Sequence, residues 1–141
     1  MLGKTLHLLH VDDEETDHLF LARAVENSGL PIQLETAKSG QQALRMLEDF
    51  EVVPDMILLD IRMPMMSGFE VLQKMKGREE LRDLSIVMFS TSGDTRDMSE
   101  ARALGAKAYC VKPNCLDDLS KLVEKLYQSW LEGTVASGWP L

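Results

Sequence analysis

The stretch MILLDIRMP, residues 56–64, decides the fold of this chain. It opens with four consecutive apolar residues, Met56 to Leu59, and then changes to the carboxylate of Asp60. A short continuous apolar run of this kind is typical of a strand that is buried on both faces, as in a parallel sheet. Open α/β sheets bind their ligands at the carboxyl ends of such strands. The stretch therefore predicts a parallel sheet with Asp60 at its functional edge.

Three more apolar runs end on polar groups in the same way. These runs, each with the polar residues that follow it, are 6–11 with Asp12 and Asp13, 86–89 with Ser90 and Thr91, and 108–111 with Lys112. Because the carboxyl ends of parallel strands meet at one edge of a sheet, we expect these polar groups to lie near Asp60.

Between the strands, apolar residues recur at helical spacing and are bounded by capping residues. This pattern predicts helices over residues 16–28, 39–49, 67–76, 94–104 and 115–133, and the stretch 32–37 predicts one more strand. Strand and helix thus alternate five times, which indicates an α/β fold with a doubly wound, five-stranded parallel sheet. We assign residues 1–133 to one domain and 134–141 to a C-terminal tail punctuated by Gly and Pro.

Composition excludes several classes of function. The 141 residues suffice for one domain but not for an additional output module. Acidic residues outnumber basic ones by 23 to 15, and without a basic cluster direct binding to nucleic acid is not expected. No apolar run approaches the roughly 20 residues that span a bilayer, and no signal peptide is recognisable. We therefore expect a cytoplasmic protein without membrane contact.

Potential ligands for zinc form no consistent pattern. Cys110 and Cys115 are five positions apart, which suits neither a zinc pair nor a disulfide framework, so we expect free thiols. His7 and His10 are three positions apart in the first predicted strand and should face opposite sides of the sheet. A histidine metal site is therefore not expected.

The acids at the predicted edge favour a hard divalent cation. If Asp12, Asp13 and Asp60 converge, their carboxylates repel one another unless a cation neutralises them. Oxygen ligands of this kind suit Mg²⁺, or Mn²⁺, better than zinc. The predicted cofactor is therefore Mg²⁺, with Mn²⁺ as a substitute.

Such a site is suited to phosphoryl transfer. A metal beside a carboxylate neutralises an incoming phosphoryl group, so that the Asp60 oxygen can act as nucleophile and form an acyl phosphate. Lys112 and Ser90 offer the cation and the hydroxyl donor that phosphoryl oxygens require. Because no nucleotide-binding loop is present, the phosphoryl donor should be a partner protein or a small phosphodonor.

Six segments of the chain, taken in order, resemble the response-regulator receiver domains of two-component signalling. The matching segments are 8–14, 55–64, 67–68, 89–92, 105–106 and 109–113, and the resemblance spans about residues 5–130. It implies a flavodoxin-like, or CheY-like, (βα)5 fold with the strand order 2-1-3-4-5.

The resemblance also implies roles for the acids and the lysine. By it, Asp60 accepts a phosphoryl group from a histidine kinase or a phosphotransfer protein, and Lys112 pairs with the phosphate. Asp13, Asp60 and the backbone carbonyl of Arg62 would ligate Mg²⁺, and Asp12 would assist through water.

The same resemblance implies a switch. Ser90 takes the position of the family's switch hydroxyl, and Tyr109 that of its rotating aromatic residue. We therefore predict a single-domain response regulator that catalyses only its own phosphotransfer and dephosphorylation and changes its binding to an unidentified downstream protein. Trp130 and the apolar tail provide more apolar surface than one core can cover, so a second copy of the chain, bound through the last helix, is a further expected partner.

A narrower resemblance lies in residues 89–94, 127–132 and 139–141. These segments are similar to the single-domain regulators associated with phytochrome-type kinases.

Two alternative functions remain at this point. One is a receiver-like interaction module that works without phosphorylation, and the intact set of polar residues argues against it. The other is an aspartate-nucleophile phosphatase of the haloacid dehalogenase type. That class needs a second acid two residues after the nucleophile, where this chain has Arg62.

Overall fold

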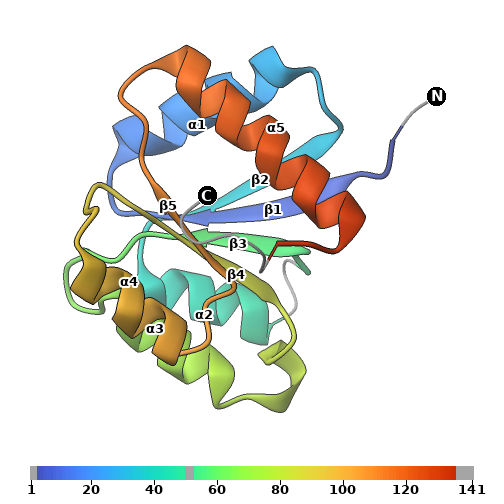
Figure 1. Ribbon diagram of the computed structural model, residues 1–141. Coiled ribbons are helices and arrows are strands. Elements are labelled where there is room, and N and C mark those ends of the chain that lie inside the picture. Colours follow the sequence, from blue (N-terminus) through green and yellow to red (C-terminus); the bar gives the residue numbers. More distant parts are fainter. Residues whose placement is uncertain (1–2, 50–52, 136–141) are drawn as a thin grey trace.

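The computed structural model describes residues 3–49 and 53–135 (Figure 1). Five strands form one parallel sheet in the order β2-β1-β3-β4-β5, which confirms the predicted doubly wound fold and its strand order. The strands are β1 (Leu6–Val11), β2 (Ile32–Ala37), β3 (Met56–Leu59), β4 (Ser85–Ser90) and β5 (Ala108–Val111).

Helices cover both faces of the sheet. Figure 1 shows α1 and α5 on one face and α2, α3 and α4 on the other. The helices are α1 (Glu15–Ser28), α2 (Gly40–Glu48), α3 (Gly68–Lys76), α4 (Thr95–Ala103) and α5 (Leu116–Glu132). A short 3-10 helix, η1 (Glu79–Leu81), precedes β4 and was not predicted, because three residues carry no readable periodicity.

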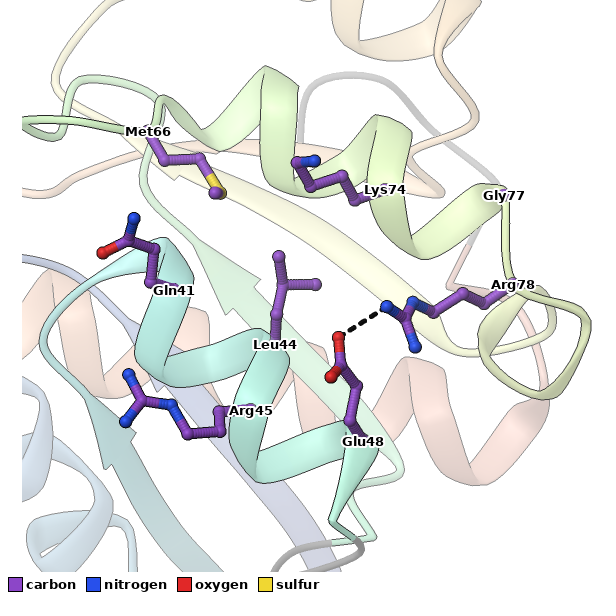
Figure 2. Close-up of a pocket in the computed structure, with 8 residues that line it drawn as sticks. All are labelled: Gln41, Leu44, Arg45, Glu48, Met66, Lys74, Gly77 and Arg78. Atoms are coloured by element: carbon purple, nitrogen blue, oxygen red, sulfur yellow. Dashed lines mark ion pairs between the residues drawn. The ribbon is translucent and has the colours of Figure 1, made fainter.

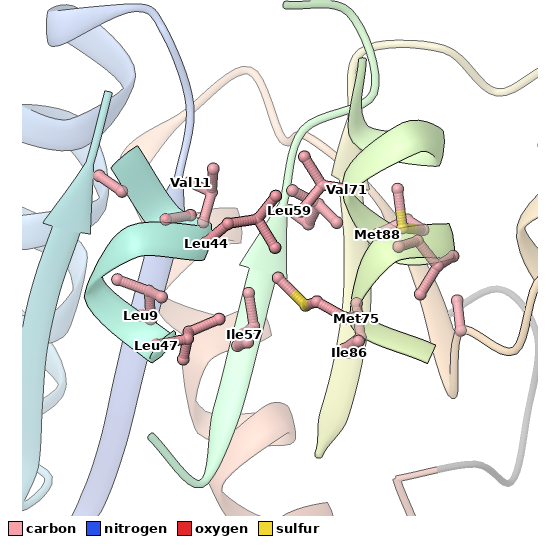
Figure 3. Packing of buried hydrophobic residues seen from close by; sticks show 14 of the residues in the cluster. Leu9, Val11, Leu44, Leu47, Ile57, Leu59, Val71, Met75, Ile86 and Met88 are labelled. Atoms are coloured by element: carbon pink, nitrogen blue, oxygen red, sulfur yellow. The ribbon is translucent and has the colours of Figure 1, made fainter. Parts of the chain in front are cut away.

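The sheet separates two hydrophobic cores. Alternate strand residues such as Ile57 and Leu59 pack under α2 and α3, as Figure 3 shows, while Met56 and Leu58 belong to the core under α1 and α5. All four residues of β3 are buried, because successive side chains of a strand point to opposite faces. This two-sided burial explains the continuous apolar run that ends at Asp60.

Side-chain caps begin several helices. Ser39 accepts a hydrogen bond from the backbone N–H of Gln42 at the start of α2. Ser67 and Glu70 form a reciprocal capping box at the start of α3. Asp94, predicted as the first residue of α4, is instead its N-cap. Each cap satisfies backbone N–H groups that the first helical turn leaves without partners.

The end of the described chain packs against the fold. Val135, within the segment predicted as a tail, is buried in the core under α5. Residues 136–141, with the final Trp139 to Leu141 of the narrower resemblance, lie outside the described residues. So does Phe50, which the apolar spacing places on the inner face of the helix predicted over residues 39–49. Within the described ranges, no helix has both the length and the apolar character needed to cross a membrane.

Candidate functional site

Three carboxylates converge at the carboxyl edge of the sheet. β1 pairs with β3 so that Val11 lies opposite Leu59, and the next residues, Asp12 and Asp60, therefore emerge side by side. One carboxylate oxygen from each of Asp12, Asp13 and Asp60 lies within 4.8 Å of the others. The convergence predicted from the sequence is confirmed.

Backbone contacts hold these acids in place. The N–H of Asp60 donates to the carbonyl of Val11 at 3.0 Å, so β3 continues its pairing with β1 up to the acid. Asp60 Oδ1 accepts the N–H of Ile61 at 3.0 Å, and its side chain is largely buried. A Cβ added at Gly68 would lie 2.1 Å from the carbonyl oxygen of Asp60, so only glycine fits behind the site.

Lys112 sits among the acids. Its Nζ lies 2.8 Å from Asp12 Oδ2, 2.9 Å from Asp17 Oδ2 and 3.5 Å from Asp60 Oδ1. The first two contacts are hydrogen bonds, and the third is an ion pair at longer range. The backbone N–H of Lys112 donates to the carbonyl of Ser90 at 2.7 Å, which anchors the residue at the end of β5.

The acids differ in their proton affinity. Burial, together with the neighbouring charge of Asp12, raises the pKa of Asp60 to about 6, and Lys112 only partly opposes this rise. Burial also acts to raise the pKa of Asp12, but interactions with His10, Lys112 and the Glu14 N–H outweigh it and lower the pKa. Of these two acids, Asp60 is thus the one whose charge is less compensated, and an additional cation would stabilise its ionised form.

Lys112 stays charged in this environment. Burial acts to lower the pKa of its ammonium group, but the hydrogen bonds to Asp12 and Asp17 and the charge of Asp60 more than offset that effect. Its pKa is therefore raised.

The two predicted switch residues come together on neighbouring strands. Ser90 is buried, and its Oγ accepts the N–H of Ser92 at 3.2 Å. Tyr109 is fully buried, and its hydroxyl donates to the carbonyl of Ser92 at 2.7 Å. Burial raises the pKa of the Tyr109 hydroxyl, so it remains a donor. Both side chains therefore hold the same segment at the end of β4.

Three residues near the acids were not predicted as part of the site. Asp17 contacts Lys112, and His18 Nε2 donates to the carbonyl of Asp12 at 2.8 Å. The His10 ring is buried and meets the His18 ring edge-on at 4.4 Å between centroids. The sequence offered one signal, because Asp17 lies in the first turn of the helix that follows Asp12 and Asp13.

A separate groove of about 790 Å³ lies between α2 and α3 (Figure 2). Arg45, Lys74 and Arg78 line it, and Glu48 forms an ion pair with Arg78 at 2.6 Å. Its single carboxylate is thus paired, whereas the edge of the sheet holds three converging ones. The groove offers no comparable chemistry.

Comparison with known proteins identifies the family. The family model of the response regulator receiver domain matches residues 8–124. The chain belongs to this family. As a receiver domain it is a response regulator of two-component signalling.

Relatives of this receiver domain include signalling proteins of similar length. The probable methanogenesis regulatory protein FilR2 of Methanothrix harundinacea is 33% identical over 128 residues, covering 88% of this chain and 83% of that protein. The phosphorylated cyanobacterial phytochrome response regulator RcpA superposes with a TM-score of 0.82 at 27% identity, covering 92% and 96%. The Mn²⁺-bound response regulator Rcp1 gives a TM-score of 0.78 at 28% identity, covering 90% and 95%. Structural neighbours thus include the phytochrome-associated regulators suggested by the narrower resemblance.

Proposed function

We propose that this receiver domain accepts a phosphoryl group on Asp60 in a Mg²⁺-dependent reaction and thereby changes its binding to partner proteins. One observation carries the proposal. Oxygens of Asp12, Asp13 and Asp60 lie within 4.8 Å of one another, and the Lys112 ammonium lies 3.5 Å from Asp60 Oδ1. Phosphoryl transfer needs this combination of a nucleophile, a metal-binding group and a fixed cation.

The donor atoms fit a hard divalent ion. Asp12, Asp13 and Asp60 contribute carboxylate oxygens, and the backbone carbonyl of Arg62 accepts no hydrogen bond from any residue that the structure describes. Oxygen ligands of this type suit Mg²⁺ and Mn²⁺. When bound, the ion supplies positive charge that keeps Asp60 ionised and neutralises oxygens of the incoming phosphoryl group. The Mn²⁺-bound form of Rcp1 supports this assignment.

The chain's own residues then have distinct tasks. A carboxylate oxygen of Asp60 attacks phosphorus, and the bond from phosphorus to the donor breaks. The Lys112 ammonium donates to a phosphoryl oxygen, because it already lies beside Asp60 and stays charged. Asp12 remains ionised because its pKa is lowered, so its carboxylate can help to bind the metal while it accepts the hydrogen bond from Lys112.

The hydroxyl of Ser90 is the proposed switch. On phosphorylation, Ser90 Oγ releases the N–H of Ser92, and its hydroxyl donates to a phosphoryl oxygen instead. Tyr109, which is bonded to the Ser92 carbonyl, then follows the displaced segment. Moving a two-state equilibrium from mostly off to mostly on needs about 5.5 kcal/mol of differential stabilisation. Hydrogen bonds to charged groups contribute about 1.5–3 kcal/mol each, so Lys112 and Ser90 together with the metal reach this range.

The partners are proposed by class. The phosphoryl donor is a histidine kinase or a phosphotransfer protein, and the signal passes to a downstream protein through the surface of α4, β5 and α5. A homodimer through α5 is a further proposal, although Trp130 already packs near Tyr127 and Lys4 of its own chain. Sedimentation of the protein with and without beryllofluoride measures whether the dimer forms.

A phosphatase activity is not proposed. The position two residues after Asp60 holds Arg62, whose guanidinium pairs with Asp97 at 2.9 Å. No acid is therefore offered there to protonate a leaving group.

Intact-mass spectrometry after incubation with acetyl phosphate tests the proposed function. The wild type should gain one phosphoryl group with Mg²⁺ and none with a chelator. Asp60→Asn should gain none, and the matched variant Asp49→Asn, at an exposed position after α2, should behave as wild type. Equal labelling of Asp60→Asn and wild type would refute the assignment, and a receiver-like module that works without phosphorylation would show no labelling in any variant.

A further inference from the structure

We propose that Asp17 is a positioning residue that holds the Lys112 ammonium back from the phosphoacceptor and so limits the affinity of the site for a phosphoryl group. This inference rests on the proposed function above and adds a residue to it. The observation is the unequal sharing of Lys112 among three carboxylates, with Asp12 and Asp17 near 2.9 Å and Asp60 at 3.5 Å.

The geometry of an ammonium group explains the consequence. Lys112 has three N–H donors, and charge-assisted hydrogen bonds measure about 2.7–2.9 Å. Asp12 and Asp17 each take one donor at hydrogen-bond length. Asp60 receives only a longer-range ion pair. Of the three carboxylates around Lys112, that of the nucleophile Asp60 therefore has the longest contact with the ammonium group.

Asp17 is not one of the clustered acids. The oxygens that converge within 4.8 Å belong to Asp12, Asp13 and Asp60. Asp17 lies in the first turn of α1 and is about one-third exposed, and in the described part of the chain its only basic partner is Lys112. Its contact with the site thus passes through the lysine.

Lys112 has little freedom to serve all its partners at once. Its side chain is 11% exposed, and its ammonium lies 5.7 Å from the centroid of the Phe89 ring. We infer that a phosphoryl group on Asp60 draws Nζ toward that carboxylate and away from Asp17, the partner on α1. Asp17 therefore favours the unphosphorylated arrangement. A partly exposed ion pair shifts such an equilibrium by up to about fivefold.

Titration with beryllofluoride, in saturating Mg²⁺, measures this effect because the anion is a phosphoryl analogue. Chemical shifts of the Ser90 and Tyr109 amides serve as the readout. Asp17→Asn should bind beryllofluoride more tightly than wild type, by up to about fivefold. The matched variant Glu15→Gln removes the same charge two residues away in the same helical turn, where Glu15 pairs with Lys38 at 3.1 Å, and it should bind as wild type does.

A gain in affinity cannot come from a damaged fold, so the expected sign is itself informative. Asp17→Asn that binds no more tightly than Glu15→Gln would overturn the inference. A double-mutant cycle adds the mechanism: in a Lys112→Met background, Asp17→Asn should have no effect. If the gain persists there, Asp17 acts by charge alone and the positioning role is wrong.

The outcome also separates this inference from the proposed function. Wild type that binds no beryllofluoride in Mg²⁺ would overturn the proposed function, and the inference with it. Wild type that binds while Asp17→Asn is unchanged would overturn the inference alone.

Discussion

Replacing the phosphoacceptor should stabilise the metal-free protein. Burial raises the pKa of Asp60 from its ordinary value of 3.8 to about 6, so ionised Asp60 is less stable in the folded than in the unfolded chain. A difference of about two pKa units, at about 1.4 kcal/mol each, is about 3 kcal/mol at pH 7. Asp60→Asn removes the charge, and its Oδ1 can still accept the N–H of Ile61. The free energy of unfolding should therefore rise by up to about 3 kcal/mol.

The pH dependence has a defined sign. Above pH 6 the folded wild type carries the full cost of the ionised group. As the pH falls toward about 4, the folded state takes up a proton before the unfolded state does, and this cost disappears. The advantage of Asp60→Asn should thus be largest above pH 6 and vanish near pH 4. The lowered pKa of Asp12 acts in the opposite direction below this range, and it does so in both proteins.

Urea unfolding followed by circular dichroism, with a chelator present, measures these differences. Wild type, Asp60→Asn and the matched surface variant Asp49→Asn should be compared at several pH values between 4 and 8. Mg²⁺ should then stabilise wild type more than Asp60→Asn, because the variant offers one carboxylate fewer. The reasoning fails if Asp60→Asn is no more stable than wild type at pH 7, or if its advantage does not change with pH.

Three other substitutions or reactions probe separate features. Gly68→Ala places a carbon 2.1 Å from the backbone carbonyl oxygen of Asp60, so it should destabilise the fold by about 1–3 kcal/mol and weaken Mg²⁺ binding. Thermal unfolding and metal titration measure these effects, and unchanged values would contradict the close packing. Tyr109→Phe removes the hydrogen bond to the Ser92 carbonyl and should cost about 1 kcal/mol of stability while phosphorylation by acetyl phosphate persists, so loss of labelling would show a chemical role instead. Burial raises the pKa of the Cys110 thiol to about 12, whereas Cys115 is exposed, so a thiol reagent at pH 8 should modify only Cys115 in the folded protein, and equally fast modification of both would disprove the burial.

The sequence predicted the acidic site because its parts follow from topology. Each apolar run ends at a polar residue, and parallel strands bring their carboxyl ends to one edge, so Asp12 and Asp60 meet whatever their side-chain rotamers. The same argument predicted Ser90 and Lys112 at this edge, and the Lys112 ammonium lies 2.8 Å from Asp12. Burial of β3 on both faces made its sequence pattern unambiguous.

The contacts of Asp17 and His18 could not be predicted in this way. Both residues lie on α1, and their reach depends on how that helix is oriented over the edge of the sheet. Asp17 stands in an acidic stretch of the kind found at ordinary helix N-termini, where negative charge is favoured, so its sequence position alone does not mark it as part of a site. The orientation of α1 distinguishes Asp17, which contacts Lys112, from Glu15, which pairs with Lys38.

Borohydride reduction of the phosphorylated protein tests most directly which acid carries the phosphoryl group. The reagent converts an aspartyl phosphate to homoserine, and peptide mass mapping then locates the changed residue. After incubation with acetyl phosphate and Mg²⁺, we predict homoserine at position 60 and unmodified aspartate at positions 12 and 13. Homoserine at either of those two positions, with Asp60 intact, would contradict the account.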